Sequence, residues 1–228
     1  MRTEILYEDE DVLVIHKPAG LPTQTAKVGQ PDAVSELKNY LAKKNGSKGQ
    51  PYLGIIHRLD QPVEGLLVFA KNKNAAAALT SQLQKKSEGL NKQYQAIVCG
   101  KLPAEEGTLV DYLYEGAGKK AEIVSEAEAG EKNAKRAELR YKVIRELSEE
   151  TTLVDIELMT GRFHQIRAQM AHAGVPLLGD RKYGTAQSDR CTSASGARNV
   201  ALCADRLSFQ HPKTGKKMDF IVKPNFPV

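Results

Sequence analysis

The stretch GIIHRLDQPVEGLLVFAKN, residues 54–72, places a histidine, an arginine and an aspartate between two apolar runs. Charged side chains are rarely kept beside a protein core without a partner, because taking an ion out of water is costly. Asp60 is therefore either half of an ion pair, with Arg58 or with a more distant arginine, or a carboxylate on which chemistry depends. In an extended chain Arg58 and Asp60 project to one side, and His57 and Leu59 project to the other.

A second group of reactive side chains lies in MTGRFHQIRAQMAHAGVPLLGDRKYG, residues 159–184. Arg162, His164 and Arg167 crowd the first turns of an expected helix, where cations oppose the helix dipole. These cations need an anion, which is either a carboxylate or a phosphate. Taken alone, His164 is better explained by ordinary half-buried packing than by chemistry.

The elements that must position these two groups are mostly strands. Pro62 and Gly65 give the Asp60 loop a defined shape between two buried runs. Strand-rich segments with only three helices predict an α+β domain on a largely antiparallel sheet. Strands are expected at 4–8, 12–16, 54–56, 66–69, 92–100, 109–114, 121–125, 136–144 and 152–159, and helices at 32–44, 72–89 and 163–173.

Three segments between these elements are expected to be irregular. KPAGLPTQ, residues 17–24, contains two prolines and a glycine and predicts a surface loop. NGSKGQP, residues 45–51, is either a linker or a mobile lid. The charged segment 126–136 predicts a hairpin connection with a solvated surface rather than a site.

Composition allows a real core and a polyanionic partner. The 228 residues are 41% hydrophobic, and 33 Lys+Arg against 28 Asp+Glu give a net charge of +5. Such a charge suits nucleic acid and a plain solvated surface equally well. The first twenty residues lack a secretory pattern, and no apolar run approaches the length of a membrane span, so a soluble, cytoplasmic protein is expected.

Metal and nucleotide cofactors are not expected. Three cysteines are an odd number without a C-x-x-C pair, and the five histidines form no familiar ligand spacing. GAGKKA, residues 116–121, lacks the βαβ context of a phosphate loop, and no P-loop or serine-hydrolase motif is present.

Five motifs in order carry a resemblance to a known family. They resemble the successive motifs of the RluA-like RNA pseudouridine synthases over nearly the whole chain. The motifs are KPAGLPTQ, HRLD…EGLLVFAK, KQYQAIV, TGRFHQIRAQMAHAGVPLLGDRKYG and LCADRLSFQHPKTGKKMDF.

The resemblance implies an isomerase of structured RNA. Its fold would be the pseudouridine synthase fold, an α+β largely antiparallel mixed sheet with flanking helices and a central active-site cleft. One catalytic domain would span residues 1–228. Many members of the family carry a small N-terminal RNA-binding domain, and this chain is expected to depart from them, because few residues precede the first predicted strand. The enzyme would convert specific uridines of ribosomal or transfer RNA to pseudouridine without metal or cofactor. A monomer is expected on a separate ground, because nothing in the sequence suggests a dimerisation helix.

The resemblance also implies roles for individual residues. Asp60 would be the essential aspartate, acting at the ribose as base or nucleophile. Tyr94 would pack against the target base and take part in proton transfer, although alone it is an ordinary inward-facing strand residue. Arg167 would pair with the aspartate and keep it ionised.

Further residues are assigned to RNA binding. Arg58 would displace the target nucleotide, and Ile166 would make an apolar contact with the base. His57 belongs to the same motif as Arg58 and is assigned to the substrate site. Other candidate RNA contacts, through phosphate, are Lys17, Arg162, Arg181, Lys182 and the lysine-rich turn 213–217.

One departure from the family pattern concerns the loop itself. The pattern usually continues HRLDxxTSG, whereas this chain has Val63 and Glu64 in place of threonine and serine. Glu64 would repel phosphate, or raise the pKa of Asp60 if it points inward. This change supports the main alternative, a non-catalytic RNA-binding protein. A carboxylate glycosidase ranks last, because Glu64 is the one nearby second acid.

Overall fold

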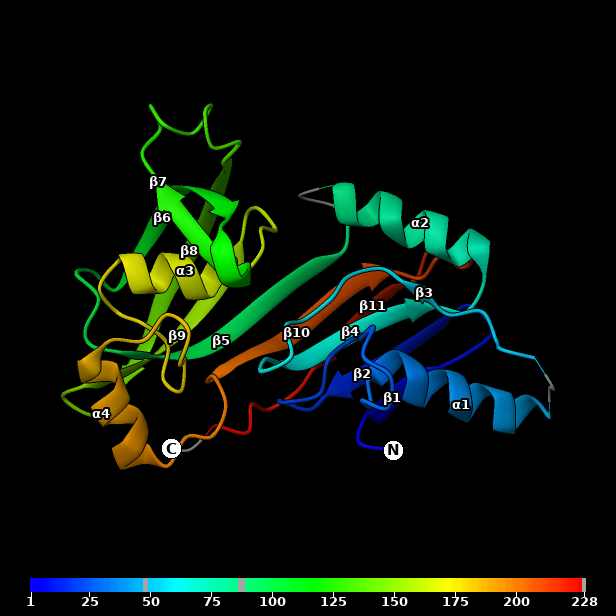
Figure 1. Cartoon of the computed structure of the whole chain (residues 1–228). Coiled ribbons are helices and arrows are strands. Elements are labelled where there is room, and N and C mark those ends of the chain that lie inside the picture. Colours follow the sequence, from blue (N-terminus) through cyan, green and yellow to red (C-terminus); the bar gives the residue numbers. More distant parts are fainter. Residues whose placement is uncertain (47–48, 86–88, 227–228) are drawn as a thin grey trace. The chain divides into compact units, whose positions relative to one another are not determined.

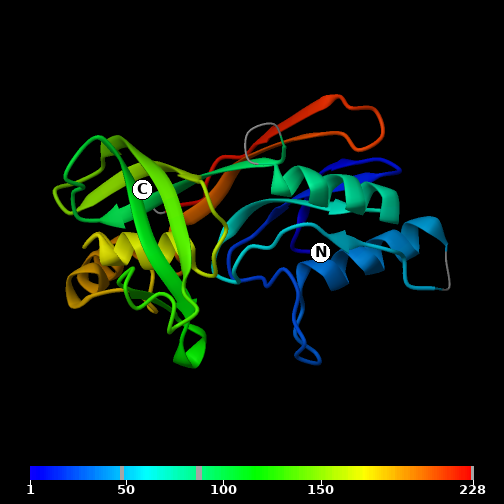
Figure 2. The same ribbon diagram turned by 90° about the horizontal axis from the view of Figure 1, so that it is seen from above.

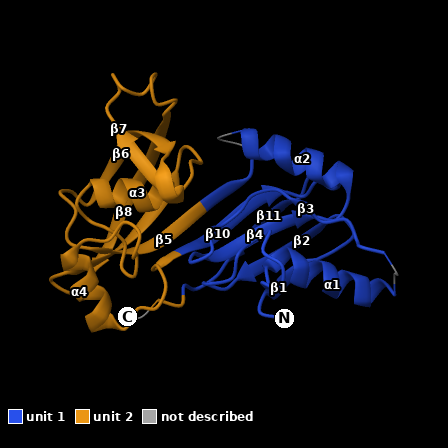
Figure 3. Cartoon of the chain, in the orientation of Figure 1, with its two compact units in different colours: residues 1–92, 203–224 blue, residues 93–202, 225–228 orange. Residues whose placement is uncertain are grey.

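The computed structural model describes residues 1–46, 49–85 and 89–226, which Figure 1 colours along the sequence. Figure 3 shows that the chain forms two compact units. Unit 1 holds residues 1–92 and 203–224, and unit 2 holds residues 93–202 and 225–228. Residues 47 and 48 of the predicted linker or lid lie outside the described residues.

Unit 1 is a mixed sheet with two helices. Its strands follow the order β1-β2-β4-β10, with β11 paired to β10 and β3 paired to β4. All these pairs are antiparallel except β4 and β10, which are parallel. The elements are β1 (Glu4–Glu8), β2 (Val12–Lys17), α1 (Ala33–Asn45), β3 (Gly54–Ile55), β4 (Glu64–Ala70), α2 (Lys73–Gln84), β10 (Leu202–Gln210) and β11 (Lys217–Ile221).

The core of unit 1 follows from the alternation of side chains along β2 and β4. One face of these strands joins Ala75 and Leu79 of α2 in a single buried cluster with the β10 residues Leu207 and Phe209. The residues that point to the other face are also fully buried, so both faces are covered. Each large side chain buried in this way contributes about 1.5–3 kcal/mol. The second set comprises Leu13, Ile15, Leu67 and Phe69.

Both helices of unit 1 begin at predicted caps. Asp32 accepts a hydrogen bond from the Ser35 N–H at 2.8 Å, and Asn72 does the same for the Ala75 N–H at 2.8 Å. α2 ends at Gln84, earlier than the predicted 89, because Lys85 leaves the helical conformation and its N–H bonds back to the Gln82 carbonyl. Residues 86–88 of the predicted helix lie outside the described part of the chain.

Unit 2 is an antiparallel sheet with two short helices. Its strands follow the order β5-β9-β8-β6-β7. Figure 2 shows the long green strands β6 and β8 running side by side, and the red-orange hairpin β10–β11 of unit 1. The elements are β5 (Asn91–Cys99), β6 (Glu106–Glu115), β7 (Ala121–Val124), β8 (Lys135–Glu146), β9 (Thr151–Leu158), α3 (Gln165–His172) and α4 (Ala186–Ser195).

The predicted α+β class with a largely antiparallel mixed sheet is confirmed. Three longer elements, α4, β10 and β11, were missed, and so was the short 3-10 helix η1 (Ala117–Lys119). The sequence of α4 has no apolar stripe, since its buried residues are Ser188 and Cys191, and the helix begins at a Thr185–Ser188 capping box. No helix in the described ranges is long and apolar enough to cross a membrane. The single domain over 1–228 stays a prediction.

Candidate active site

The Asp60 loop connects β3 to β4 in unit 1 and is fastened to the loop that follows β2. Thr23 Oγ1 donates to the Leu59 carbonyl at 2.8 Å and accepts from the Leu59 N–H at 3.1 Å. The Gly20 N–H donates to the Gln61 carbonyl at 2.8 Å. Because backbone on both sides of Asp60 is bonded, the point from which this half-buried side chain leaves the loop is fixed.

Lys17 joins the same two loops through its side chain. Its ammonium donates to the carbonyls of Leu21 at 2.7 Å, Pro18 at 3.0 Å and Gln61 at 3.5 Å. Burial lowers the pKa of Lys17 to about 8, while the carboxylates of Asp60 and Glu64 act in the opposite direction. The side chain is fully buried, so the predicted phosphate contact does not fit this placement.

The loop after β2 is also less exposed than predicted. Leu21 is 1% exposed and Thr23 is 3% exposed, although the segment 17–24 was expected at the surface. Prolines and glycine do prevent regular structure there, but the side chains between them turn inward. This loop is therefore part of the support of Asp60.

Val63 and Glu64, which depart from the family pattern, both point into unit 1. The Glu64 carboxylate lies 4.0 Å from His16 Nε2 and accepts a hydrogen bond from the Cys203 thiol. Both side chains are buried, so the Glu64 carboxylate is not placed to repel a phosphate group that approaches from solvent. Gly65, which follows, has φ +130°, and a Cβ there would lie 2.5 Å from the Ala204 backbone nitrogen.

The expected alternation around Asp60 is confirmed. His57 and Leu59 are buried, whereas Arg58 is exposed and Asp60 is half-buried. No described carboxylate forms an ion pair with Arg58, so an Arg58–Asp60 pair is not the reason for these charges.

His57 occupies the interior and not the surface. Its Nε2 accepts from the Val68 N–H at 3.4 Å, and burial, with a smaller effect of Lys92, holds its pKa well below the ordinary value. The ring is therefore neutral. Its assignment to the substrate site does not fit this placement.

In unit 2, Arg167 is held by a carboxylate that was not singled out from the sequence. Its Nε donates to Asp180 Oδ2 at 2.7 Å and its Nη2 donates to Asp180 Oδ1 at 2.7 Å. Both side chains are at least nine-tenths buried. Asp180 Oδ1 also accepts from the N–H groups of Lys182 and Tyr183. The sequence predicted that the cations of this segment need an anion. For Arg167 this anion is a carboxylate of the same unit.

His164 and Tyr183 complete the surroundings of Arg167. The Arg167 guanidinium lies 5.1 Å from the Tyr183 ring centroid, and its Nη1 lies 3.4 Å from His164 Nε2. His164 Nδ1 lies 2.8 Å from the Tyr183 hydroxyl. Burial, together with Arg167 and Lys182, lowers the pKa of His164 to about 4. His164 is therefore neutral at pH 7 and is not one of the cations that the sequence suggested.

The other predicted residues of unit 2 lie on separate elements. Tyr94 is buried on β5, opposite Ile156 of β9, and Ile166 is buried in the first turn of α3. Arg162 is exposed, and its Nε donates to the Arg136 carbonyl at 3.0 Å. Each half of the predicted site thus has a defined local structure within its own unit.

Comparison with known proteins decides the family. A sequence model of the family described as RNA pseudouridylate synthase matches residues 11–172. This chain belongs to the RNA pseudouridylate synthase family. The prediction of an isomerase of this family is thereby confirmed.

Several curated proteins are similar to this synthase over most of its length. An "Uncharacterized RNA pseudouridine synthase YlyB" of Bacillus subtilis is 34% identical over 96% of this chain and 68% of its own. A "Ribosomal large subunit pseudouridine synthase D" of Zymomonas mobilis is 35% identical over 95% of this chain and 68% of its own. A "tRNA pseudouridine synthase C" of Haemophilus ducreyi is 31% identical over 96% of this chain and 89% of its own.

Solved structures confirm the fold of the synthase. "Human RNA Pseudouridylate Synthase Domain Containing 4" matches with a TM-score of 0.75 at 23% identity and covers 97% of this chain and 88% of its own. "Human RNA Pseudouridylate Synthase Domain Containing 1" matches with a TM-score of 0.73 at 21% identity. At such identity these likenesses concern the fold alone.

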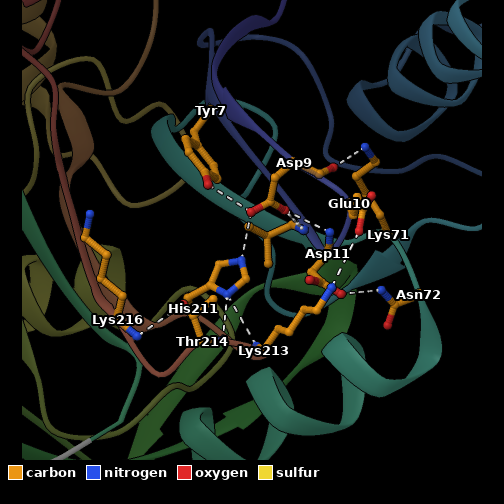
Figure 4. A network of polar contacts seen from close by, with 11 residues as sticks. Tyr7, Asp9, Glu10, Asp11, Lys71, Asn72, His211, Lys213, Thr214 and Lys216 are labelled. Atoms are coloured by element: carbon orange, nitrogen blue, oxygen red, sulfur yellow. Dashed lines mark hydrogen bonds and ion pairs between the residues drawn. The ribbon is translucent and has the colours of Figure 1, made fainter.

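Figure 4 shows a cluster of possible metal ligands in the synthase, Asp9, Asp11 and His211. His211 Nδ1 accepts from the Lys213 and Thr214 N–H groups, so its proton is on Nε2, which donates to Asp9 Oδ2 at 2.8 Å. Neither ring nitrogen then has a lone pair left for a metal. The cluster instead ties the lysine-rich turn after β10 to the turn between β1 and β2.

Three residues of the synthase's candidate site were missed from the sequence. Thr23, Asp180 and Tyr183 all lie inside the motifs quoted for the family, but nothing in their type or spacing marks them. Asp180 is thirteen residues from Arg167, and the pairing depends on the loop between α3 and α4. Proximity created by such a loop has no periodic signature in a sequence.

Proposed function

We propose that this protein isomerises particular uridines of structured RNA to pseudouridine, with Asp60 as the catalytic carboxylate. The observation that carries the proposal is the match of residues 11–172 to the RNA pseudouridylate synthase family, which includes Asp60, Tyr94 and Arg167. The fastened geometry of the Asp60 loop supports it, because a group that must meet a ribose needs a fixed position.

In this reaction the bond from ribose C1′ to N1 breaks and a bond from C1′ to C5 forms. The proton at C5 leaves, N1 gains a proton, and no oxidant or second substrate is needed. Asp60 acts at the ribose, as base or as nucleophile. A base within a helix or tight loop must first be flipped out, at a cost of about a few kcal/mol.

The remaining roles come from the family resemblance and are part of the proposal. Arg167, whose Nε and Nη2 are held by Asp180, also pairs with the catalytic aspartate. Tyr94 packs against the target base and takes part in proton transfer, and Ile166 makes an apolar contact with the base. Arg58 helps to displace the nucleotide, which suits its exposure. Arg162 contacts the RNA.

The substrate class follows from relatives and charge. The similar proteins include a ribosomal large subunit synthase and a tRNA synthase, so we assign ribosomal or transfer RNA as substrate. The net charge of +5 favours a polyanion. We propose a cytoplasmic monomer that uses neither metal nor nucleotide cofactor.

The main alternative, a non-catalytic RNA-binding protein, depended on Val63 and Glu64. Both side chains are buried among residues of unit 1 and leave the backbone support of Asp60 in place. The departure from the family pattern therefore gives this alternative little support.

Pseudouridine mapping across total ribosomal and transfer RNA tests the proposal. Cells without the gene should lose one or a few sites, and the intact gene should restore them while an Asp60→Ala copy should not. An unchanged map, or restoration by Asp60→Ala, would contradict the proposal. Measured RNA affinity of the purified Asp60→Ala protein is the control for folding and binding.

A further inference from the structure

A pocket of about 340 Å³ lies in unit 2, and neither Arg167 nor Asp180 lines it. Its size is near the lower end of the roughly 300–1,000 Å³ found for small-ligand sites. It is formed by the end of β6, the segment before β8 and the loop before α3. Its lining comprises Leu113, Tyr114, Glu115, Lys132, Asn133, Lys135, Arg162 and Phe163.

The charge of this pocket suits an anion. Lys132, Lys135 and Arg162 outnumber its one acid, Glu115. None of the described carboxylates forms an ion pair with Lys135. Arg162 is held in place because its Nε donates to a backbone carbonyl and its own N–H donates to Gln165 Oε1 at 2.9 Å.

Phe163 contributes an aromatic ring to the lining of this pocket. Its ring is stacked on His164 with centroids 3.9 Å apart and an interplanar angle of 19°, yet the residue remains 40% exposed. A ring supported on one face and open elsewhere is a platform for stacking. An aromatic ring beside fixed cations is the combination that binds bases and phosphates of unpaired nucleic acid.

We propose that this pocket binds one nucleotide of the RNA other than the target uridine, with its base stacked on Phe163 and its phosphate beside Arg162 and Lys135. The inference rests on the proposed function and extends it, because it assigns a place to unpaired RNA next to the target. Glu115 is the one acid of the lining and would repel the phosphate, so we assign the phosphate to the side of Arg162 and Lys135. The segment 126–136, expected as mere solvated surface, then takes part in binding through Lys132 and Lys135.

The chain has no tryptophan, so Phe163→Trp introduces a single indole that preserves stacking and can be excited apart from the eight tyrosines. Titration with a single-stranded octaribonucleotide of mixed sequence should quench its emission by at least half. The matched control is Ile144→Trp, at an exposed position nine residues along β8 from Lys135, whose emission should not respond. Inorganic phosphate alone should quench neither variant.

Affinity gives an independent measurement. Phe163→Leu keeps an apolar side chain without a π face and should weaken binding of the labelled octaribonucleotide about tenfold, while Phe163→Tyr should restore it. Quenching of Phe163→Trp by uridine monophosphate at the same concentration as the octamer would contradict an RNA site and indicate a mononucleotide site. Absence of quenching, or wild-type affinity in Phe163→Leu, would overturn the inference.

The outcome separates this inference from the proposed function. Quenching together with an inactive wild-type protein would refute the proposed isomerase while leaving the nucleotide site. Pseudouridine formation by the wild type without quenching of Phe163→Trp would refute the nucleotide site alone.

Discussion

Arg167 is positioned by its protein neighbours, chiefly Asp180. Two parallel hydrogen bonds of 2.7 Å fix the plane of the guanidinium, and the Tyr183 ring lies over it at 5.1 Å. Asp180 is in turn fixed by two backbone N–H groups. The arginine is therefore held before any RNA arrives.

Asp180→Asn removes the charge partner of Arg167 but keeps the shape of the side chain. Because breaking a buried ion pair by removing the charge of one partner is costly, the variant should lose about 3 kcal/mol of unfolding free energy. Urea denaturation measures this loss. Asp219→Asn, at an exposed pair with Lys217, should cost about 0.5 kcal/mol or less. Equal effects of the two substitutions would contradict the positioning role.

Lys17 is buried in unit 1, and burial of its positive charge costs free energy of folding. In the folded protein its pKa is lowered to about 8 from 10.5, chiefly by burial. Between these two pH values the unfolded chain binds more protons than the folded chain, so stability rises with pH across that window. Below pH 8 the ammonium is charged in both states and the slope disappears.

Lys17→Met should remove this pH dependence. The variant loses three hydrogen bonds and should be less stable at pH 7 by about 1–3 kcal/mol. Relative to it, the wild type should gain about 3 kcal/mol between pH 8 and pH 10.5. Chemical denaturation at several pH values measures both curves, and parallel curves would refute the assignment.

Some residue roles could be predicted from the sequence and others could not. The alternation that exposes Arg58 and buries Leu59 follows from chain geometry alone. The burial of Lys17 does not, because a lysine that donates to backbone carbonyls has the same sequence signature as one that binds phosphate. Asp180 escaped notice because its partner is brought to it by a loop.

At the scale of elements, the Asp60 loop depends on a side chain in another loop. Thr23 satisfies both the N–H and the carbonyl of Leu59, and it is itself 3% exposed. The fastening joins the segment after β2 to the segment before β4. The geometry of Asp60 is therefore a property of two loops together.

Thr23→Val keeps the volume of the side chain but leaves both backbone groups of Leu59 without their partner. We expect a loss of about 1–3 kcal/mol in stability and a lower turnover number. Thermal denaturation and pseudouridine formation at saturating RNA measure the two effects. The control is Thr25→Val, which removes a hydroxyl that donates to Gln30. A turnover number equal to that of the control would contradict the role of the fastening.

Elements with strong periodicity or caps could be predicted, and those without could not. Asp32 and Asn72 mark their helices from the sequence. α4 has no apolar stripe, and β11 alternates between exposed and half-buried residues, so neither has a clear pattern. α2 ends early because the Lys85 N–H bonds to the carbonyl of Gln82, three residues back, a local contact that the sequence pattern does not mark.

At the scale of the whole molecule, the net charge of +5 predicts salt-dependent RNA binding. The lysine-rich turn after β10 is a candidate contact, because the His211 network holds it in place. Its lysines are exposed and do not determine the fold. Replacing one of them should therefore change RNA binding without changing the structure.

Lys216→Ala should weaken RNA binding uniformly across sequences and reduce the slope of log affinity against log salt by about 0.7–0.9. Filter binding between low and moderate salt measures the slope. Lys101→Ala, whose ammonium is paired with Glu146 at 2.7 Å, should change it less. An unchanged slope in Lys216→Ala would exclude this turn from the RNA contact.

The most direct test of the account is pseudouridine formation by the purified protein on its RNA, compared between the wild type and Asp60→Asn in a single turnover. We expect complete conversion by the wild type and no detectable product from Asp60→Asn, with RNA affinity within about threefold. Conversion by Asp60→Asn would contradict the catalytic role of the carboxylate. Failure of the wild type on every ribosomal and transfer RNA site would contradict the proposed function itself.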